Sequence, residues 1–133
     1  IFTGANADFG GIEINKKIKN FANANKNKYK FIESLGESLY LDVMNNSDFL
    51  FGNSSSAFLE ASALGKPALN IGARQNGRIK PVNIIDCENN TDSIIHSIGR
   101  ALSNNFLEKI KVAKNPYGDG NSSKKILNFL LNN

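Results

Sequence analysis

The segment that decides the fold extends from Gly52 to Gly65 and reads GNSSSAFLEASALG. The apolar strand before it ends in a small polar turn, and we expect this turn to open directly into a helix over residues 54–64, with Glu60 one turn in. Serine hydroxyls and unpaired backbone N–H groups at a helix N-terminus favour an anion. A carboxylate just beyond can accept both hydroxyls of a ribose. Phosphate followed by ribose predicts a nucleotide ligand.

A well-capped helix is the simpler interpretation of the same residues, because Asn and Ser are favoured N-caps. Three consecutive serines, however, exceed what capping needs. Glu60 does not complete a capping box either, since the residue three positions before it is Ala57. We therefore favour the ligand interpretation.

Short apolar strands alternate with amphipathic helices along the whole chain. Strands are predicted at residues 1–3, 29–32, 48–51, 68–71 and 82–87. Helices are predicted around the apolar stripe of Ile14, Ile18, Phe21 and Ala22, at residues 39–44 and 54–64, after a cap at Thr91, and at residues 106–113 and 122–131. This alternation predicts an α/β fold with a Rossmann-like parallel sheet and helices on both faces.

In such sheets, ligands bind beyond the carboxyl ends of the strands. The loops at these ends are residues 4–11, 34–38, 52–56 and 72–78. The last of them is bounded by glycines and contains Arg74 and Arg78, whose guanidinium groups bind oxyanions in a fork. A solvated surface loop is the alternative, but its position after a strand end favours an anion site.

Composition excludes several classes of function. The chain has 133 residues, enough for one domain, and its net charge of +4 comes from lysine-rich stretches that are typical of solvated helix faces. We expect no nucleic-acid partner. No apolar run is long enough to cross a bilayer, so we expect no membrane partner and a cytoplasmic location.

The residue inventory argues against a metal or cofactor site. Cys87 is the single cysteine, at an apolar strand end, and is expected to be a buried, inert thiol. His96 is the single histidine and is not expected to be catalytic. No dinucleotide fingerprint of the form Gly-x-Gly-x-x-Gly occurs. No Walker A motif occurs either, because Gly65-Lys66 is followed by proline and not by Ser or Thr. We expect no cofactor and no metal.

Three motifs together resemble the UDP-N-acetylglucosamine 2-epimerase family, and the hydrolysing branch in particular. They are Gly52 to Ala61 with the serines and Glu60, Leu64-Gly65-Lys66-Pro67, and Asn70 to Arg78 with Arg-Gln-Asn-Gly-Arg. Residues 2–8 also resemble that branch's Pro-Asn-x-Asp segment, although Gly4-Ala5 stands where the family often has proline. Residues 115–120 look like its C-terminal loop.

The resemblance implies a GT-B arrangement of two Rossmann-like domains. This chain looks like the C-terminal, UDP-binding domain over residues 1–133, without its first strand and helix. The interior-strand character of residues 1–3 also suggests a fragment. By resemblance, Ser54 and Ser55 contact the diphosphate, and Glu60 takes the ribose hydroxyls. Arg74 approaches the phosphates with Asn6 nearby, the main chain at Leu35 receives uracil, and Arg78 is a weaker assignment.

The family's activity, as implied by the resemblance, converts UDP-N-acetylglucosamine or a di-N-acetylated UDP-sugar to the C2-inverted free sugar and UDP, for sialic or legionaminic acid synthesis. The acid and base groups would lie outside this chain, so we expect no catalytic residue within it. The expected partners are UDP or a UDP-sugar, the missing N-terminal domain, and a second copy in a homo-oligomer. The alternatives are half of a GT-B glycosyltransferase and a non-catalytic UDP-sugar-binding module.

Overall fold

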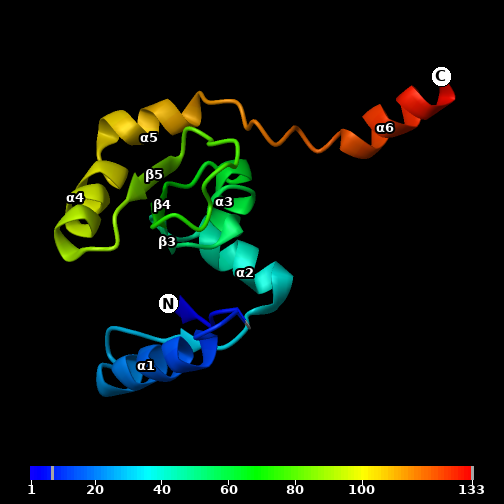
Figure 1. Cartoon of the computed structure of the whole chain (residues 1–133). Helices are drawn as coiled ribbons and strands as arrows, with labels where there is room; N and C mark the ends of the chain where they lie inside the picture. Colours follow the sequence, from blue (N-terminus) through cyan, green and yellow to red (C-terminus); the bar gives the residue numbers. More distant parts are fainter. Residues whose placement is uncertain (7, 133) are drawn as a thin grey trace. The chain divides into compact units, whose positions relative to one another are not determined.

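The computed structural model describes residues 1–6 and 8–132 (Figure 1). Contacts between residues divide the chain into two compact units, Ile1–Asp42 and Val43–Asn133. One unit contains a sheet of two strands and the other a sheet of three, and every strand pair is parallel. The predicted α/β class with parallel strands is therefore confirmed. A single domain over residues 1–133 stays a prediction.

The first unit is a strand–helix–strand crossover. Its parallel strands need such a crossover, and the rings of Phe2, Phe21 and Tyr29 hold helix and strands together at centroid distances of 4.9–6.3 Å. Ala22 on the same helix is buried, whereas Ile14 is 48% exposed, so the predicted apolar stripe is only partly covered. The elements are β1 (Phe2–Thr3), α1 (Gly11–Ala24), β2 (Phe31–Ile32) and α2 (Gly36–Asn45), which continues into the second unit.

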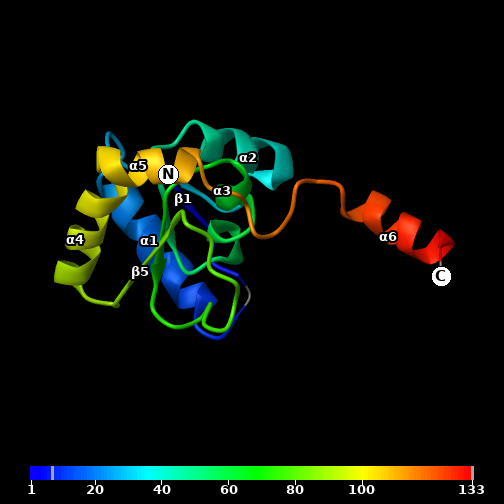
Figure 2. The same cartoon turned by 90° about the horizontal axis from the view of Figure 1, so that it is seen from above.

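The second unit is built on three parallel strands in the order β3-β4-β5. Its elements are β3 (Leu50–Gly52), η1 (Ser55–Ala57), α3 (Glu60–Ala63), β4 (Ala68–Ile71), β5 (Ile84–Cys87), α4 (Thr91–Ala101), α5 (Asn104–Lys111) and α6 (Ser122–Leu131). Figure 1 shows α4 and α5 on one side of the strands and α3 on the other. In Figure 2, as in Figure 1, α6 extends beyond the loop after α5, and none of its residues is buried.

The core of the second unit lies between its strands and α4. Leu69, Ile85, Cys87 and Ala101 are buried together, with Ile98 and other apolar side chains packed around them. Successive strand residues point to opposite faces. β4 therefore turns Leu69 toward α4 and its neighbours Ala68 and Asn70 toward the other face, and all three are buried. Helices thus cover both faces, as predicted.

Two predicted elements need correction. The helix expected over residues 54–64 is divided into the short 3-10 helix η1 and the four-residue α3. Ser54 is the reason at its start, because its hydroxyl accepts a hydrogen bond from the Ser56 N–H, and such local bonds compete with an α-helix. The cap of α4 is Asn90 rather than Thr91, and its Oδ1 accepts from the Ser93 N–H at 2.9 Å.

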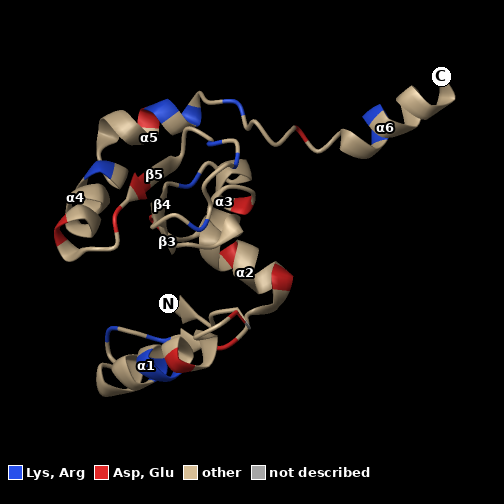
Figure 3. Ribbon diagram, viewed as in Figure 1, with Lys and Arg blue, Asp and Glu red and all other residues tan. Residues whose placement is uncertain are grey.

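The lysine-rich stretches lie on solvated surfaces, as the sequence predicts. Lysines between residues 16 and 30 are exposed on α1 and the loop after it, and those between 109 and 125 are exposed on α5, α6 and the connecting loop (Figure 3). Within residues 1–6 and 8–132, no helix combines the length and the apolar character needed to cross a bilayer.

Candidate functional site

The serine turn, residues 52–56, connects β3 to η1. Ser54 is exposed at the N-cap and Ser55 is half-buried. The Ser54 hydroxyl accepts from the Ser56 N–H and donates to the Ser56 hydroxyl, at 3.3 and 3.2 Å. Because η1 has only three residues, its macrodipole is small. An anion here would therefore depend on hydroxyls, backbone N–H groups and nearby cations more than on the dipole that we predicted.

Glu60 is the first residue of α3 and is half-buried. Its Oε2 atom is buried and has no hydrogen-bond partner within the described part of the chain. A buried polar atom without a partner typically costs about 1–3 kcal/mol. An external donor, such as a ligand hydroxyl, would remove this cost. The structure thus places a carboxylate with unused accepting capacity directly after the serine turn.

The arginine loop, residues 72–78, reaches the serine turn through the carbonyl oxygen of Asn53. Arg74 donates to this oxygen from Nη1 at 3.2 Å, and Gln75 donates to it from Nε2 at 2.7 Å. Strand register explains the approach, because Gly52 at the end of β3 lies opposite Asn70 on β4. Both loops therefore leave the carboxyl edge of one sheet. The structure thus brings Arg74 to the serine turn at Asn53, and its role in binding phosphate stays a prediction.

The second arginine of the loop, Arg78, is less closely associated with the serine turn than Arg74 is. It is exposed at the end of the loop, and its backbone N–H donates to the Gln75 carbonyl at 3.3 Å. No hydrogen bond or ion pair joins its side chain to the serine turn within residues 1–6 and 8–132. Its role stays a prediction.

Asn6 and Leu35 belong to the first unit. Asn6 is exposed in the loop after β1, and Leu35 is half-buried in the loop after β2. Asn15 on α1 holds the first loop, since its Oδ1 accepts from the Ala5 N–H at 2.6 Å and its Nδ2 donates to the Ala5 carbonyl at 3.4 Å. Because β1 and β2 are parallel, both loops leave the same edge of their sheet. A uracil role for Leu35 and a phosphate role for Asn6 stay predictions.

The C-terminal loop, residues 112–121, is attached to the same unit as the serine turn. The Tyr117 hydroxyl donates to the Ile79 carbonyl at 2.7 Å, and the Ser62 hydroxyl donates to Asn115 Oδ1 at 3.1 Å. Tyr117 is thus engaged just beyond the arginine loop.

Asn83 holds η1 to the segment before β4 by hydrogen bonds, and the sequence did not reveal this role. Its side chain is buried, and Nδ2 donates to the carbonyls of Ala57 and Lys66 at 3.2 and 2.8 Å. It therefore ties the end of η1 to the segment that enters β4. An Asn at the start of a predicted strand was the only signal, and it does not reveal these distant partners.

We expect Asn83→Ala to lower the free energy of unfolding by about 1 kcal/mol, because two carbonyls lose their donor, although the buried Oδ1 atom without a partner in the described residues is removed at the same time. Urea unfolding measures this change. Asn76→Ala is the matched control, since Asn76 is exposed, and its effect should stay within about 0.5 kcal/mol. Equal effects of the two substitutions would contradict the role assigned to Asn83.

Asp86 on β5 links Lys80 and Asn70. Asn70 Nδ2 donates to one carboxylate oxygen at 2.8 Å, and Lys80 pairs with the other at 2.5 Å. Partial burial opposes ionisation of Asp86, but the hydrogen bonds from Lys80 and Asn70, together with the Lys80 charge, outweigh it and lower its pKa. These bonds hold the exit of the arginine loop near β5.

A pH prediction follows from Asp86. Since its folded pKa is below the unfolded value of about 4, its contribution to stability is present above that pH and is lost as pH falls through the folded pKa. Asp86→Asn should therefore reduce stability at pH 7 and have less effect in strong acid. Urea midpoints at both pH values measure this. Asp119, whose pKa is lowered to about 2 by hydrogen bonds from Asn121 and Lys125, is common to both proteins and cancels in the comparison. A pH-independent difference would contradict the ion pair.

Cys87 and His96, the single cysteine and the single histidine, lie on β5 and α4. Cys87 is buried, and desolvation raises the pKa of its thiol, as expected of a structural cysteine. His96 is exposed on α4. Among the described residues, no group of three or more His, Cys, Asp or Glu side chains is arranged to hold a metal ion.

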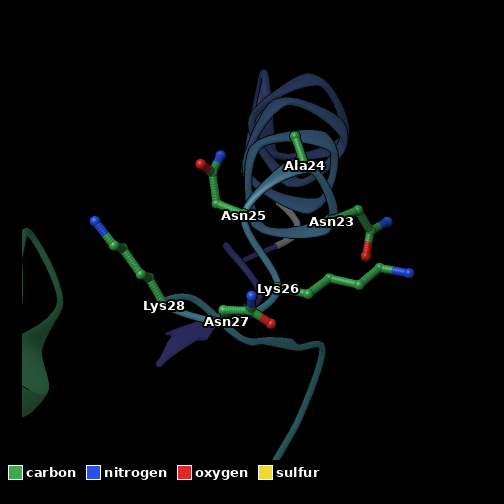
Figure 4. A pocket seen from close by; sticks show the side chains of 6 residues that line it. All are labelled: Asn23, Ala24, Asn25, Lys26, Asn27 and Lys28. Atoms are coloured by element: carbon green, nitrogen blue, oxygen red, sulfur yellow. The ribbon is translucent and has the colours of Figure 1, made fainter.

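A separate hollow of about 440 Å³ lies at the end of α1. It is lined by residues 23–28, whose labelled side chains point in different directions (Figure 4). None of the predicted site residues lines it, and its lining is a single turn of chain. We therefore do not assign the ligand site to this hollow.

The fold and the site together define a class of protein: an α/β protein whose polar and charged loops meet at the carboxyl ends of parallel strands. The sequence profile described as UDP-N-acetylglucosamine 2-epimerase matches residues 1–131. The chain therefore belongs to the UDP-N-acetylglucosamine 2-epimerase family, as the sequence motifs predicted.

Two relatives and one solved structure are similar to the chain. The chain is 43% identical over 90 residues to the GDP/UDP-N,N'-diacetylbacillosamine 2-epimerase (hydrolyzing) of Campylobacter jejuni, covering 68% of this chain and 23% of that protein. It is 33% identical over 117 residues to the polysialic acid biosynthesis protein P7 of Escherichia coli, covering 88% and 29%. The hydrolysing relative supports the predicted branch of the family.

The solved structure is the Methanocaldococcus jannaschii UDP-GlcNAc 2-epimerase in complex with UDP-GlcNAc and UDP. It matches with a TM-score of 0.69 at 21% identity, covering 92% of this chain and 33% of that chain. This likeness shows a fold of the GT-B type. The chain spans about a quarter to a third of the length of these relatives.

Proposed function

We propose that this chain is the UDP-binding half of a hydrolysing UDP-sugar 2-epimerase. In this proposal, residues 1–133 form the C-terminal Rossmann-like domain of a longer protein, which we call the parent protein. Its substrate is UDP-N-acetylglucosamine or a di-N-acetylated UDP-sugar, and its products are UDP and the C2-inverted free sugar. The names of the Campylobacter and Escherichia coli relatives support a di-N-acetylated substrate and a role in sialic-type sugar synthesis.

The observation that carries the proposal is the buried Oε2 atom of Glu60 near the serine turn, which has no hydrogen-bond partner in the part of the chain that the structure describes. A buried carboxylate oxygen without a donor suits the hydroxyls of a ribose. Ser54 and Ser55 precede Glu60 in the serine turn, and Arg74 contacts the serine turn through the Asn53 carbonyl. Hydroxyls and a guanidinium suit a diphosphate. The groups that suit the diphosphate therefore precede the carboxylate that suits the ribose, which matches the order of diphosphate and ribose in UDP.

The contribution of this half to catalysis is electrostatic. In the proposed reaction, the C2 proton is removed and the C1–O bond between the sugar and UDP breaks, which leaves a C1=C2 double bond, and negative charge accumulates on the leaving diphosphate. Arg74 and the donors of the serine turn stabilise that charge, and fixed donors at such a position are a large source of rate acceleration. Water then adds to the unsaturated sugar with inversion at C2. The groups that move the sugar protons belong to the other domain of the parent protein.

Calorimetric titration with UDP tests the proposed nucleotide binding. CMP and AMP are the control ligands, and Glu60→Ala is the control variant in which binding should be impaired. We expect UDP-selective binding that the substitution weakens about 10-fold to 100-fold. A folded protein that does not bind UDP would contradict the proposal. Product analysis of the parent protein then separates an epimerase from a glycosyltransferase, because only the epimerase releases UDP and a C2-inverted sugar without an acceptor.

A further inference from the structure

Gln75 differs from the rest of the arginine loop in its burial. The residue is only 4% exposed, whereas Arg74 and Asn76 on either side are exposed. The buried amide donates from Nε2 to the Asn53 carbonyl at 2.7 Å, across 22 residues of sequence. A buried polar side chain in an exposed loop indicates a specific role in holding that loop.

The conformation of the loop gives this contact its importance. Gly72 and Gly77 bound the loop with φ values of +74° and +86°, a region that side chains other than glycine rarely adopt. Between them, the Asn76 N–H donates to the Ala73 carbonyl at 3.0 Å, which makes a tight turn. The turn fixes the shape of the loop, but its attachment to the serine turn passes through the Asn53 carbonyl.

Two donors share that carbonyl. Arg74 approaches it at 3.2 Å and Gln75 at the shorter distance of 2.7 Å. An anionic ligand would attract the guanidinium away from Asn53, because a hydrogen bond to a charged oxygen is stronger than one to a neutral carbonyl. Gln75 would still satisfy the carbonyl and keep the loop in place. Arg74 could then engage the ligand without loss of the contact between the two loops.

We propose that Gln75 is a positioning residue that holds the arginine loop against the serine turn, so that Arg74 is preorganised for the diphosphate of a bound nucleotide. This inference rests on the proposed function, because it takes Arg74 as a diphosphate ligand. Preorganised groups need less reordering when the ligand binds and therefore bind it more tightly.

A double-mutant cycle on the parent protein tests the inference, with UDP as the titrated probe. Gln75→Met keeps the length of the side chain but removes the donor, and we expect the Kd for UDP to rise about threefold to tenfold. Arg74→Ala should weaken binding more. If Gln75 acts through Arg74, the double mutant should bind UDP as Arg74→Ala alone does. Asn76→Ala is the matched control in the same loop and should leave the Kd unchanged.

Thermal unfolding without ligand supplies the readout that separates positioning from a structural role. Gln75 Oε1 is buried and has no hydrogen-bond partner in the described residues. Gln75→Met therefore removes an unfavourable atom together with a favourable bond, and the midpoint should change little. Gln75→Leu provides a second apolar variant if the methionine variant folds poorly. A loss of UDP affinity at nearly constant midpoint supports positioning.

The possible failures are distinguishable. Two outcomes would overturn the role of Gln75 and leave the proposed function standing. In the first, the effects of the two substitutions on the Kd for UDP are additive. In the second, Gln75→Met leaves the Kd unchanged while Arg74→Ala weakens binding. An Arg74→Ala protein that binds UDP as tightly as the wild type would overturn the diphosphate assignment, and the role of Gln75 with it.

Discussion

Arg74→Ala in the parent protein is expected to slow turnover by about 100-fold to 1,000-fold, equivalent to about 2.7–4 kcal/mol in the barrier. The guanidinium lies beside the serine turn, 3.2 Å from the Asn53 carbonyl, where the leaving diphosphate would be held. Charge on that group is greatest in the transition state. Removal of the cation should therefore reduce kcat more than it raises KM. Steady-state kinetics with coupled detection of UDP release measures both parameters.

Arg100→Ala is the matched control for Arg74→Ala. Arg100 is exposed near the end of α4, so the substitution removes the same charge at a position away from the serine turn. The control should retain wild-type kinetics. Arg78→Ala tests the weaker assignment, and an intermediate effect would support it. An Arg74→Ala enzyme with unchanged turnover and unchanged KM would rule out the diphosphate role.

Glu60 substitutions are expected to have the second largest effect. Glu60→Ala should raise the Kd for UDP by about 10-fold to 100-fold, because hydrogen bonds to a charged acceptor typically contribute about 1.5–3 kcal/mol. The same substitution removes the buried Oε2 atom, which has no partner within residues 1–6 and 8–132, so the unliganded protein should be no less stable. Calorimetry gives the affinity, and thermal unfolding without ligand gives the stability.

A ribose analogue makes the Glu60 test specific. The wild type should bind 2′-deoxy-UDP more weakly than UDP, whereas Glu60→Ala should bind both ligands equally, since the carboxylate that distinguishes them is gone. Glu108→Ala is the control, because Glu108 is an exposed carboxylate paired with Lys111 on α5. If Glu60→Ala continues to distinguish the two ligands, Glu60 does not bind the ribose 2′-hydroxyl.

Much of the architecture was predictable because its signals are local. The strand predicted at residues 68–71 is β4 with the same bounds, since a short apolar run follows Pro67 and ends at Gly72. The closing helix is also found at the predicted residues, 122–131. In each unit the predicted loops follow the strand ends, because parallel strands bring their carboxyl ends to the same edge of their own sheet. That rule together with residue chemistry predicts Ser54, Glu60 and Arg74 as site residues, and their roles stay predictions.

The errors arose where several local preferences compete. Asn90 and Thr91 are both acceptable caps, and only the backbone conformation of Asn90 selects it. The helix over residues 54–64 has a suitable apolar pattern. Its interruption depends on the Ser54 hydroxyl and on Asn83, which donates to the Ala57 carbonyl from 26 residues away. Sequence periodicity contains no information about such a partner.

The sequence by itself determined the parallel α/β class, the family and the chemistry of the loops, because these depend on periodicity, turn residues and side-chain type. Only the tertiary structure decided which groups meet. Arg74 and Gln75 both donate to the Asn53 carbonyl, and these bonds join atoms that are distant along the chain. Asn83 likewise donates to the distant carbonyls of Ala57 and Lys66. Folding also leaves the Glu60 Oε2 atom buried without a hydrogen-bond partner among the described residues. Strand register places these atoms, and register is set by the packing of the whole sheet against its helices.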